Sequence, residues 1–181
     1  DDYVIGLKRP TFCTYVEAKT RLWGSIQGAT ANKFGIYYGR TKSDPTKMYR
    51  FTQRYGATRQ HAWTAVKTAL DQLGRLADRP TPGFVALDEN PLSQMFKAKI
   101  LSLYFPDKFL AVCSEDDLVK LAEALELGSS LPLSRIQHDL LDVKAANAVT
   151  KDWSNPKFMS FLYHAYPLKG KALAGEVVSK P

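Results

Sequence analysis

Side chains that carry catalysis or bind metals are sparse in this sequence and lie far apart. His61, His138 and His164 stand in separate segments, with no cysteine pair or carboxylate at metal-ligand spacing. A Glu-Ala-Lys triplet at 17–19 matches only a fragment of a metal-dependent nuclease site, because it has no convincing partner aspartate upstream. We therefore predict no catalytic residues, no metal site and no cofactor, as for a binding domain that is not an enzyme.

The sequence also lacks a phosphate loop. The run Lys169, Gly170, Lys171 has neither the leading glycine nor the Ser/Thr that follows the Gly-Lys pair in such loops. The acidic run at 115–117 falls at the start of a predicted helix, where negative charge is favourable without any further role. No nucleotide-driven motor is expected within this chain.

Positive charge is concentrated in the N-terminal half. Residues 1–79 hold 14 Lys/Arg against 6 Asp/Glu, whereas residues 80–181 hold 11 against 12. The segment 33–67, here called the basic window, has a surplus equal to the net charge of the whole chain, +7, because Asp44 is its only carboxylate. The cations of the basic window are Lys33, Arg40, Lys42, Lys47, Arg50, Arg54, Arg59 and Lys67.

Aromatic residues are interleaved with these cations. They are Phe34, Tyr37, Tyr38, Tyr49, Phe51, Tyr55 and Trp63. Lys and Arg neutralise phosphates with release of counterions, and aromatic or guanidinium planes can meet bases and sugars. The pattern favours a nucleic acid as the partner. In the alternative interpretation, the rings are the buried face of a hairpin and the cations are its solvated face.

Periodicity predicts the elements that must position this window. Two β-rich runs, 33–40 and 47–52, are separated by turn formers and predict a hairpin, with Arg50 on the face opposite Tyr49 and Phe51. The clearest helix covers 58–76, with Thr58 as its cap. Further helices are predicted at 11–23, 92–104, 115–127, about 134–149 and 157–165, and short strands at 84–87 and 109–113.

These elements define an α+β fold, with a small antiparallel sheet surrounded by five or six helices. With 181 residues and 45% hydrophobic content, the chain fits one globular domain. No apolar stretch approaches membrane-spanning length and the N-terminus does not resemble a signal peptide, so we expect no membrane contact and a cytoplasmic location. Cys13 and Cys113 are expected to be reduced core thiols, with one long-range disulfide as the alternative.

Two motifs carry a resemblance to a known family. They are Lys-Phe-Gly-x-Tyr-Tyr-Gly at 33–39 and Leu-Ser-x-Met-Phe-Lys-x-Lys-Ile-Leu-x-Leu-Tyr-Phe-Pro-Asp-Lys-Phe-Leu at 92–110. The chain resembles the DNA-recognition modules fused to modification-dependent restriction enzymes of the McrA and McrB types. The resemblance implies that a separate nuclease or motor domain supplies the effector activity. Residues 1–168 would then form the recognition domain, and residues 169–181 the start of a linker.

Within that group the chain is most similar to sulfur-binding domains, which read phosphorothioate DNA. The resemblance implies a sulfur pocket made by Tyr166, Pro167 and Gly170, although glycine stands where alanine is expected. Sulfur is larger, more polarizable and less well hydrated than oxygen, so an apolar dimple in a basic surface would favour it. Lys169 and Lys171 would then hold flanking phosphates.

The remaining DNA contacts would come from the basic window, with Arg suited to guanine edges. A phosphate contact is also predicted for Lys108, against the alternative of a plain surface charge.

Two other functions remain open from the sequence. A methylated base could be flipped into a pocket walled by Tyr37, Tyr38 and Trp63. Alternatively, the basic hairpin could bind an acidic protein partner.

Overall fold

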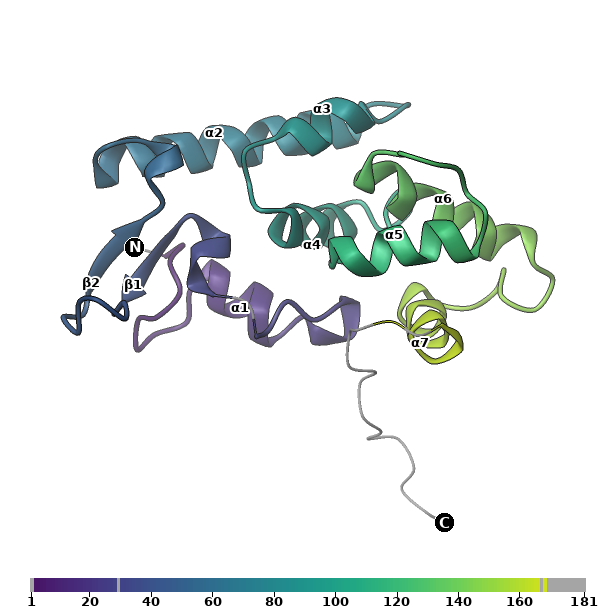
Figure 1. Cartoon of the computed structure of the whole chain (residues 1–181), viewed down its shortest axis with the longest axis horizontal. Coiled ribbons are helices and arrows are strands. Elements are labelled where there is room, and N and C mark those ends of the chain that lie inside the picture. The colour runs from purple at the N-terminus through teal and green to yellow at the C-terminus, as the bar shows by residue number, and fades with distance from the viewer. Residues whose placement is uncertain (1, 29, 167, 169–181) are drawn as a thin grey trace, which may run out of the picture.

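The computed structural model describes residues 2–28, 30–166 and 168 (Figure 1). This part of the chain forms seven α-helices and one two-stranded antiparallel sheet, which confirms the predicted α+β class of a single domain. The helices are α1 (Phe12–Ala18), α2 (Arg59–Asp78), α3 (Phe84–Glu89), α4 (Gln94–Tyr104), α5 (Glu115–Ala124), α6 (Leu133–Ala146) and α7 (Asn155–Ala165). The strands are β1 (Ile36–Gly39) and β2 (Met48–Phe51), and the 3₁₀ turns are η1 (Arg21–Trp23), η2 (Ala31–Phe34) and η3 (Gln53–Tyr55).

The two strands form a hairpin with one aromatic face and one polar face. Their register pairs Tyr38 with Tyr49 and Tyr37 with Arg50. Because side chains alternate along a strand, Tyr49 and Phe51 lie on one face and Arg50 lies on the other, as the sequence predicts. Tyr49 and Phe51 pack against the hydrophobic core, so the opposite face of the hairpin is directed outward.

Helix α2 begins where the sequence predicts. The Thr58 hydroxyl accepts a hydrogen bond from the His61 amide at 3.2 Å and caps the helix. One stripe of the helix is buried, at Ala62, Val66, Ala69, Leu73 and Ala77. Figure 1 shows α2 running from the hairpin end of the molecule toward α3, so the first turns of α2 and the hairpin belong to the same end.

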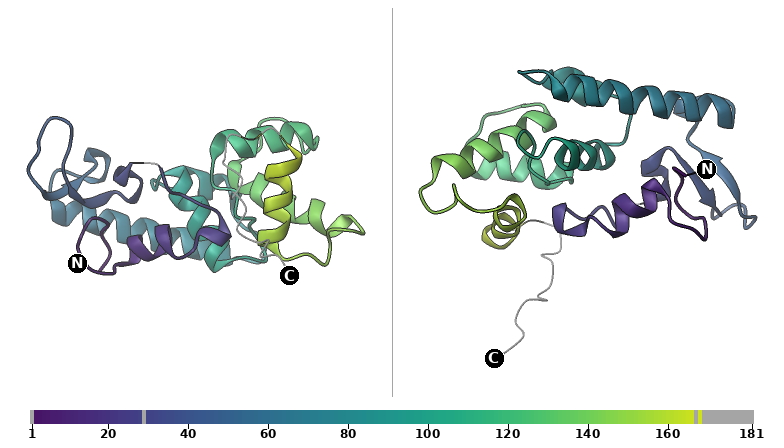
Figure 2. Two further views of the ribbon diagram at one scale, coloured as in Figure 1. Left: turned by 90° about the horizontal axis from the view of Figure 1, so that it is seen from below. Right: turned by 180° about the vertical axis from the view of Figure 1, so that it is seen from behind.

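The interior consists of two clusters of buried side chains. The first joins the N-terminal segment, the hairpin, α1, α2 and α4. The second lies among α5, α6 and α7, at the end of the molecule opposite the hairpin (Figure 2). Cys13 and Cys113 are buried and form no disulfide, as the sequence predicts. None of the helices among the described residues is both long enough and apolar enough to span a membrane.

Lys99 is fully buried within this interior. Its Nζ donates hydrogen bonds to the carbonyl oxygens of Thr20, Trp23 and Gly24, each at 2.6 Å. All three protons of the ammonium group therefore have acceptors, which offsets the cost of burying the charge. Because the acceptors belong to the chain around η1, Lys99 fixes that turn to α4.

Two predicted strands are absent from the structure. The run 84–87 forms helix α3, because a four-residue apolar run fits a buried helical turn as well as a strand. The run 109–113 is buried but irregular, because the chain bends at Ala111 and the Val112 amide donates to Leu110 O at 2.9 Å. Its Leu110 amide instead donates to the backbone oxygen of Gln137 at 3.0 Å, and the Gln137 side chain donates to Leu110 O at 2.7 Å.

Several element boundaries also differ from the prediction. The first helix ends at Ala18 and is followed by η1, so 11–23 is not one helix. Strand β1 begins at Ile36 because η2 and Gly35, with a left-handed φ of 80°, occupy the preceding positions. Helix α7 is capped by Ser154, and Asn155 is its first residue.

We predict that Lys99→Met lowers the free energy of unfolding by about 2 to 4 kcal/mol, because three buried carbonyl oxygens lose their donor. Urea denaturation followed by circular dichroism measures this change. Lys151→Met, at an exposed position, is the control and should change the value by less than about 0.5 kcal/mol. Equal effects of the two substitutions would contradict the structural role of Lys99.

Candidate nucleic-acid interface

The loop that joins β1 to β2 is held by Arg50. Its Nε donates to Gly39 O at 3.0 Å, and its Nη2 donates to Asp44 Oδ2 at 2.7 Å and to Thr46 O at 3.0 Å. Asp44 also accepts a hydrogen bond from the Thr46 amide at 2.9 Å. The hydrogen bond from Arg50 lowers the pKa of the Asp44 carboxyl to about 2. The shape of the loop therefore depends on a guanidinium that the hairpin itself supplies.

Two carboxylates are paired with cations of the basic window, and one of them, Asp44, is the only carboxylate within it. Asp44 binds Arg50, and Glu17 binds the buried ammonium of Lys33. The loop cations Arg40, Lys42 and Lys47 are exposed and have no partner among the described residues. Because no free carboxylate remains beside them within the basic window, the end of the hairpin presents uncompensated positive charge.

Cations near the start of α2 lie over aromatic rings. The Arg59 guanidinium is 4.9 Å from the ring centre of Tyr49, and Lys67 Nζ is 5.7 Å from that of Trp63. Such contacts hold a charge at the surface while the ring packs inward. Arg59 thereby joins α2 to β2, and its charge adds to the basic end of the hairpin.

Arg54 is held in the same way by Tyr55. The guanidinium lies 4.8 Å from the ring centre of Tyr55, and its Nη2 donates to Tyr55 Oη at 2.9 Å. Tyr55 Oη in turn donates to Pro91 O at 2.9 Å. Burial raises the pKa of the Tyr55 hydroxyl, which keeps it protonated as a donor.

Three predicted DNA contacts have internal roles instead. Lys33 is only 5% exposed and its ammonium is paired with Glu17, so that charge is not presented at the surface. Arg50 is used to hold the hairpin loop. The Lys108 ammonium donates to Ala77 O, Asp78 O and Arg79 O at 3.0, 3.1 and 2.9 Å, which satisfies the carbonyls at the C-terminal end of α2.

The predicted base pocket is not assembled as expected. Tyr37 and Tyr38 lie on opposite faces of β1, so they cannot wall one pocket together with Trp63. A different hollow of about 130 Å³ lies on the inner side of the hairpin. Its lining includes Tyr3, Tyr49 and Trp63, with Arg59 and Gln60 as the polar members. Tyr3 was missed because its contribution depends on the N-terminal segment folding against β1.

The proposed sulfur pocket lies largely outside the described residues. These omit Pro167, Lys169, Gly170 and Lys171. Tyr166 follows α7 and packs, half-buried, against the second cluster of the interior. Figure 1 and Figure 2 place α7 in the half of the molecule away from the hairpin. Tyr166 and the basic hairpin are therefore separate regions of the surface.

We compared the chain with known families, curated proteins and solved structures. No family model matches the chain, and neither the curated proteins nor the solved structures contain a significant match. Among residues 2–28, 30–166 and 168, no group of three His, Cys, Asp or Glu side chains has the arrangement of a metal site. Interpretation of this surface therefore depends on the geometry of its own residues.

We predict that acid releases the hairpin loop in a transition that depends on Arg50. The Asp44 pKa is lowered on folding. The hydrogen bond between Asp44 and Arg50 therefore stabilises the loop fully at pH values above the ordinary carboxyl pKa of 3.8, and this stabilisation is lost as the pH falls through about 2. The amide resonance of Thr46, which donates to Asp44, reports this transition in an NMR pH titration.

The variant Arg50→Gln should move the midpoint upward, toward the ordinary carboxyl value. Asp44→Asn is the control, because it removes the titrating group and should abolish the transition. A midpoint that is the same with and without Arg50 would show that the guanidinium does not set the Asp44 pKa.

Proposed function

We propose that this chain binds double-stranded DNA through the end of its hairpin and the first turns of α2. The observation that carries the proposal is the group of exposed cations at this end, Arg40, Lys42, Lys47, Arg59 and Lys67, beside carboxylates that are already paired. Lys and Arg side chains on such a surface neutralise phosphates of a nucleic-acid backbone and release the counterions bound there. The chain itself would act by binding, and a separate fused domain would supply cutting or translocation.

The shape of this end supports a duplex as the ligand. The hairpin projects from the body of the molecule, and α2 begins beside it (Figure 1). A projecting two-stranded ribbon can enter a DNA groove while adjacent cations contact the backbone on either side. The contact between Arg59 and Tyr49 keeps the two elements in a fixed relation, so their relative position does not have to be ordered at the moment of binding.

The resemblance described above leads us to propose that the recognised DNA carries a modification, with a backbone sulfur as the first candidate mark. Tyr166 would supply part of the apolar pocket at a second contact with the duplex, because α7 lies in the half of the molecule away from the hairpin. The remaining members of that pocket lie outside the described residues. A methylated base is the second candidate. The hollow lined by Tyr3, Tyr49 and Trp63 favours it, because aromatic walls with Arg59 and Gln60 nearby suit a planar, polar base.

We predict that the triple variant Arg40→Ala, Lys42→Ala, Lys47→Ala weakens binding to every duplex. The slope of log K against log salt should become shallower by about 2 to 3, since each lost phosphate contact removes roughly one unit. A mobility shift at two salt concentrations measures both effects. The control neutralises Lys120, Lys144 and Lys151, in the other half of the molecule. Salt-insensitive binding, or no binding to duplex DNA, would favour an acidic protein partner instead.

We predict that the two candidate marks respond to different substitutions. With matched unmodified, phosphorothioate and methylated duplexes, Tyr166→Ala should reduce a preference for the phosphorothioate duplex, whereas Trp63→Leu should reduce a preference for the methylated one. Thermal melting of each variant checks that it is folded. If Tyr166→Ala lowers the affinity for all three duplexes equally, Tyr166 is not part of a sulfur pocket.

A further inference from the structure

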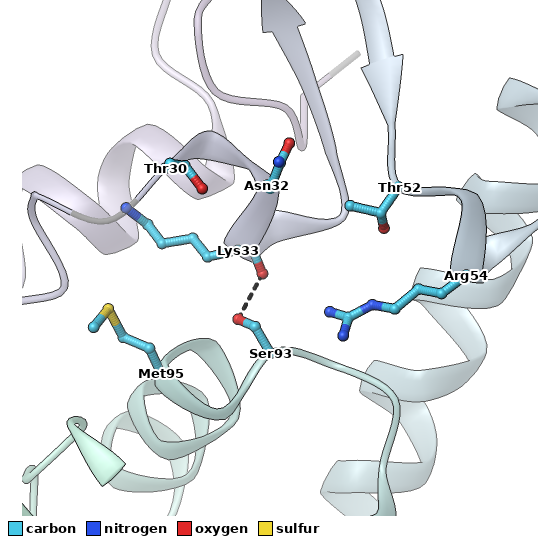
Figure 3. A pocket seen from close by; sticks show the side chains of 7 residues that line it. All are labelled: Thr30, Asn32, Lys33, Thr52, Arg54, Ser93 and Met95. Carbon is cyan, nitrogen blue, oxygen red and sulfur yellow. Dashed lines mark hydrogen bonds between the residues drawn. The ribbon is translucent and has the colours of Figure 1, made fainter. Parts of the chain in front are cut away.

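A second hollow lies between η2, η3 and the start of α4 (Figure 3). It is lined by Thr30, Asn32, Lys33, Thr52, Arg54, Ser93 and Met95, and it contains no carboxylate. Asn32 and Thr52 also line a groove along the outer face of the hairpin, which includes Tyr37, Met48 and Arg50. The hollow is therefore continuous with the polar face of the hairpin.

The polar groups of this hollow converge from three elements. Figure 3 shows the Arg54 guanidinium reaching from η3 toward the start of α4, with Asn32 and Thr52 on the hairpin side. Arg54 uses one donor for Tyr55 Oη, which holds the guanidinium in place while its other donors remain available. The buried Thr52 Oγ1 has no hydrogen-bond partner among the described residues. An oxygen-rich ligand would supply acceptors to the free donors of Arg54, and to Thr52 Oγ1 once that side chain turns toward the hollow.

The first turn of α4 adds partial positive charge to the same hollow. Ser93 is the cap residue, but its hydroxyl donates to Lys33 O at 2.9 Å and does not cap the helix. The first amides of this 11-residue helix are thus left without a side-chain acceptor. Lys97, one turn into α4, is buried and donates to Asp88 O. Burial lowers the pKa of its ammonium, the Asp88 carboxylate raises it, and the nearby Arg54 guanidinium lowers it by a smaller effect. The Arg54 guanidinium and the helix end therefore both add positive charge at this side of the hollow.

We propose that this hollow binds one phosphate group. It offers a planar guanidinium held in place and the first amides of α4 without a side-chain acceptor, which are donors that phosphate oxygens require, and Asn32 and Thr52 form part of its wall. As a deepening of the proposed function, on which this identification rests, the group is a backbone phosphate of the DNA strand that follows the outer face of the hairpin. A free or terminal phosphate is the other source of the same chemistry.

The test uses the full chain and three probes: inorganic phosphate, an unmodified duplex with 5′-hydroxyl ends, and a single strand with a 5′-phosphate. Inorganic phosphate, titrated at constant ionic strength against chloride, should shift the NMR amide signals of Asn32, Thr52 and Met95. Arg54→Gln should weaken phosphate binding about tenfold or more, because charged hydrogen bonds are lost. Arg54→Lys keeps the charge but lacks the planar guanidinium, so its affinity for phosphate should lie between those of the unchanged chain and of Arg54→Gln.

Arg75→Gln is the matched control, because it removes one arginine from an exposed site of α2 and should leave phosphate binding unchanged. A second variant, Thr52→Val, preserves the shape of the side chain and should weaken phosphate binding less than Arg54→Gln does. On the duplex, Arg54→Gln should reduce the salt slope by about one unit if the bound group is a backbone phosphate.

The outcomes separate this inference from the proposed function. Phosphate binding at these residues without any duplex binding would retain the site, assign it to a free or terminal phosphate, and overturn the proposed function. Duplex binding that Arg54→Gln leaves unchanged, with no phosphate shifts at Asn32 and Thr52, would overturn the site and retain the function. Tighter binding of the 5′-phosphorylated strand than of the duplex, lost in Arg54→Gln, would replace the backbone phosphate by a terminal one.

Discussion

The surface of this molecule depends on one packing constraint: the aromatic face of the hairpin must lie against α2. A two-stranded hairpin is marginally stable by itself, so it needs cover on one face. Tyr49 and Phe51 provide that contact, and Arg59 extends over the Tyr49 ring from α2. Once this face is fixed, alternation along the strands leaves Tyr37 and Arg50 on the outside.

Buried and half-buried lysines are a second feature of the structure, and the ammonium group of each has backbone acceptors. Lys99 binds three carbonyls around η1, Lys108 binds the last carbonyls of α2, and Lys97 donates to Asp88 O. These lysines donate to backbone carbonyl oxygens at the ends of helices and turns, where a helix leaves its last carbonyls without an internal donor. Together with the pairs formed by Lys33 and Arg50, these contacts separate the structural cations from the exposed ones that form the proposed DNA-binding surface.

The local sequence pattern predicted those helices and strands whose apolar residues repeat regularly. The spacing of apolar residues and the Thr58 cap located the start of α2, and strand alternation placed Arg50 opposite the aromatic face. Short apolar runs were ambiguous, because four or five such residues fit a helix, a strand or an extended core segment equally well. The run 109–113 illustrates this ambiguity. Gln137 of α6 accepts from the Leu110 amide and donates to the Leu110 carbonyl, and no sequence pattern predicts that hydrogen-bond partner.

The sequence by itself determined the α+β class, the single basic window and its mixture of cations with rings. Only the tertiary structure decided which of those cations are free. In the sequence, Lys33 and Arg50 are cations of the same window as Arg40 and Lys42. In the structure, Lys33 is paired with Glu17 and Arg50 with Asp44, whereas Arg40 and Lys42 are exposed. The hollow between η2, η3 and α4 likewise joins Asn32, Arg54 and Ser93, which are distant in sequence. Ion pairing and cavity formation depend on distances between such segments, and folding alone sets those distances.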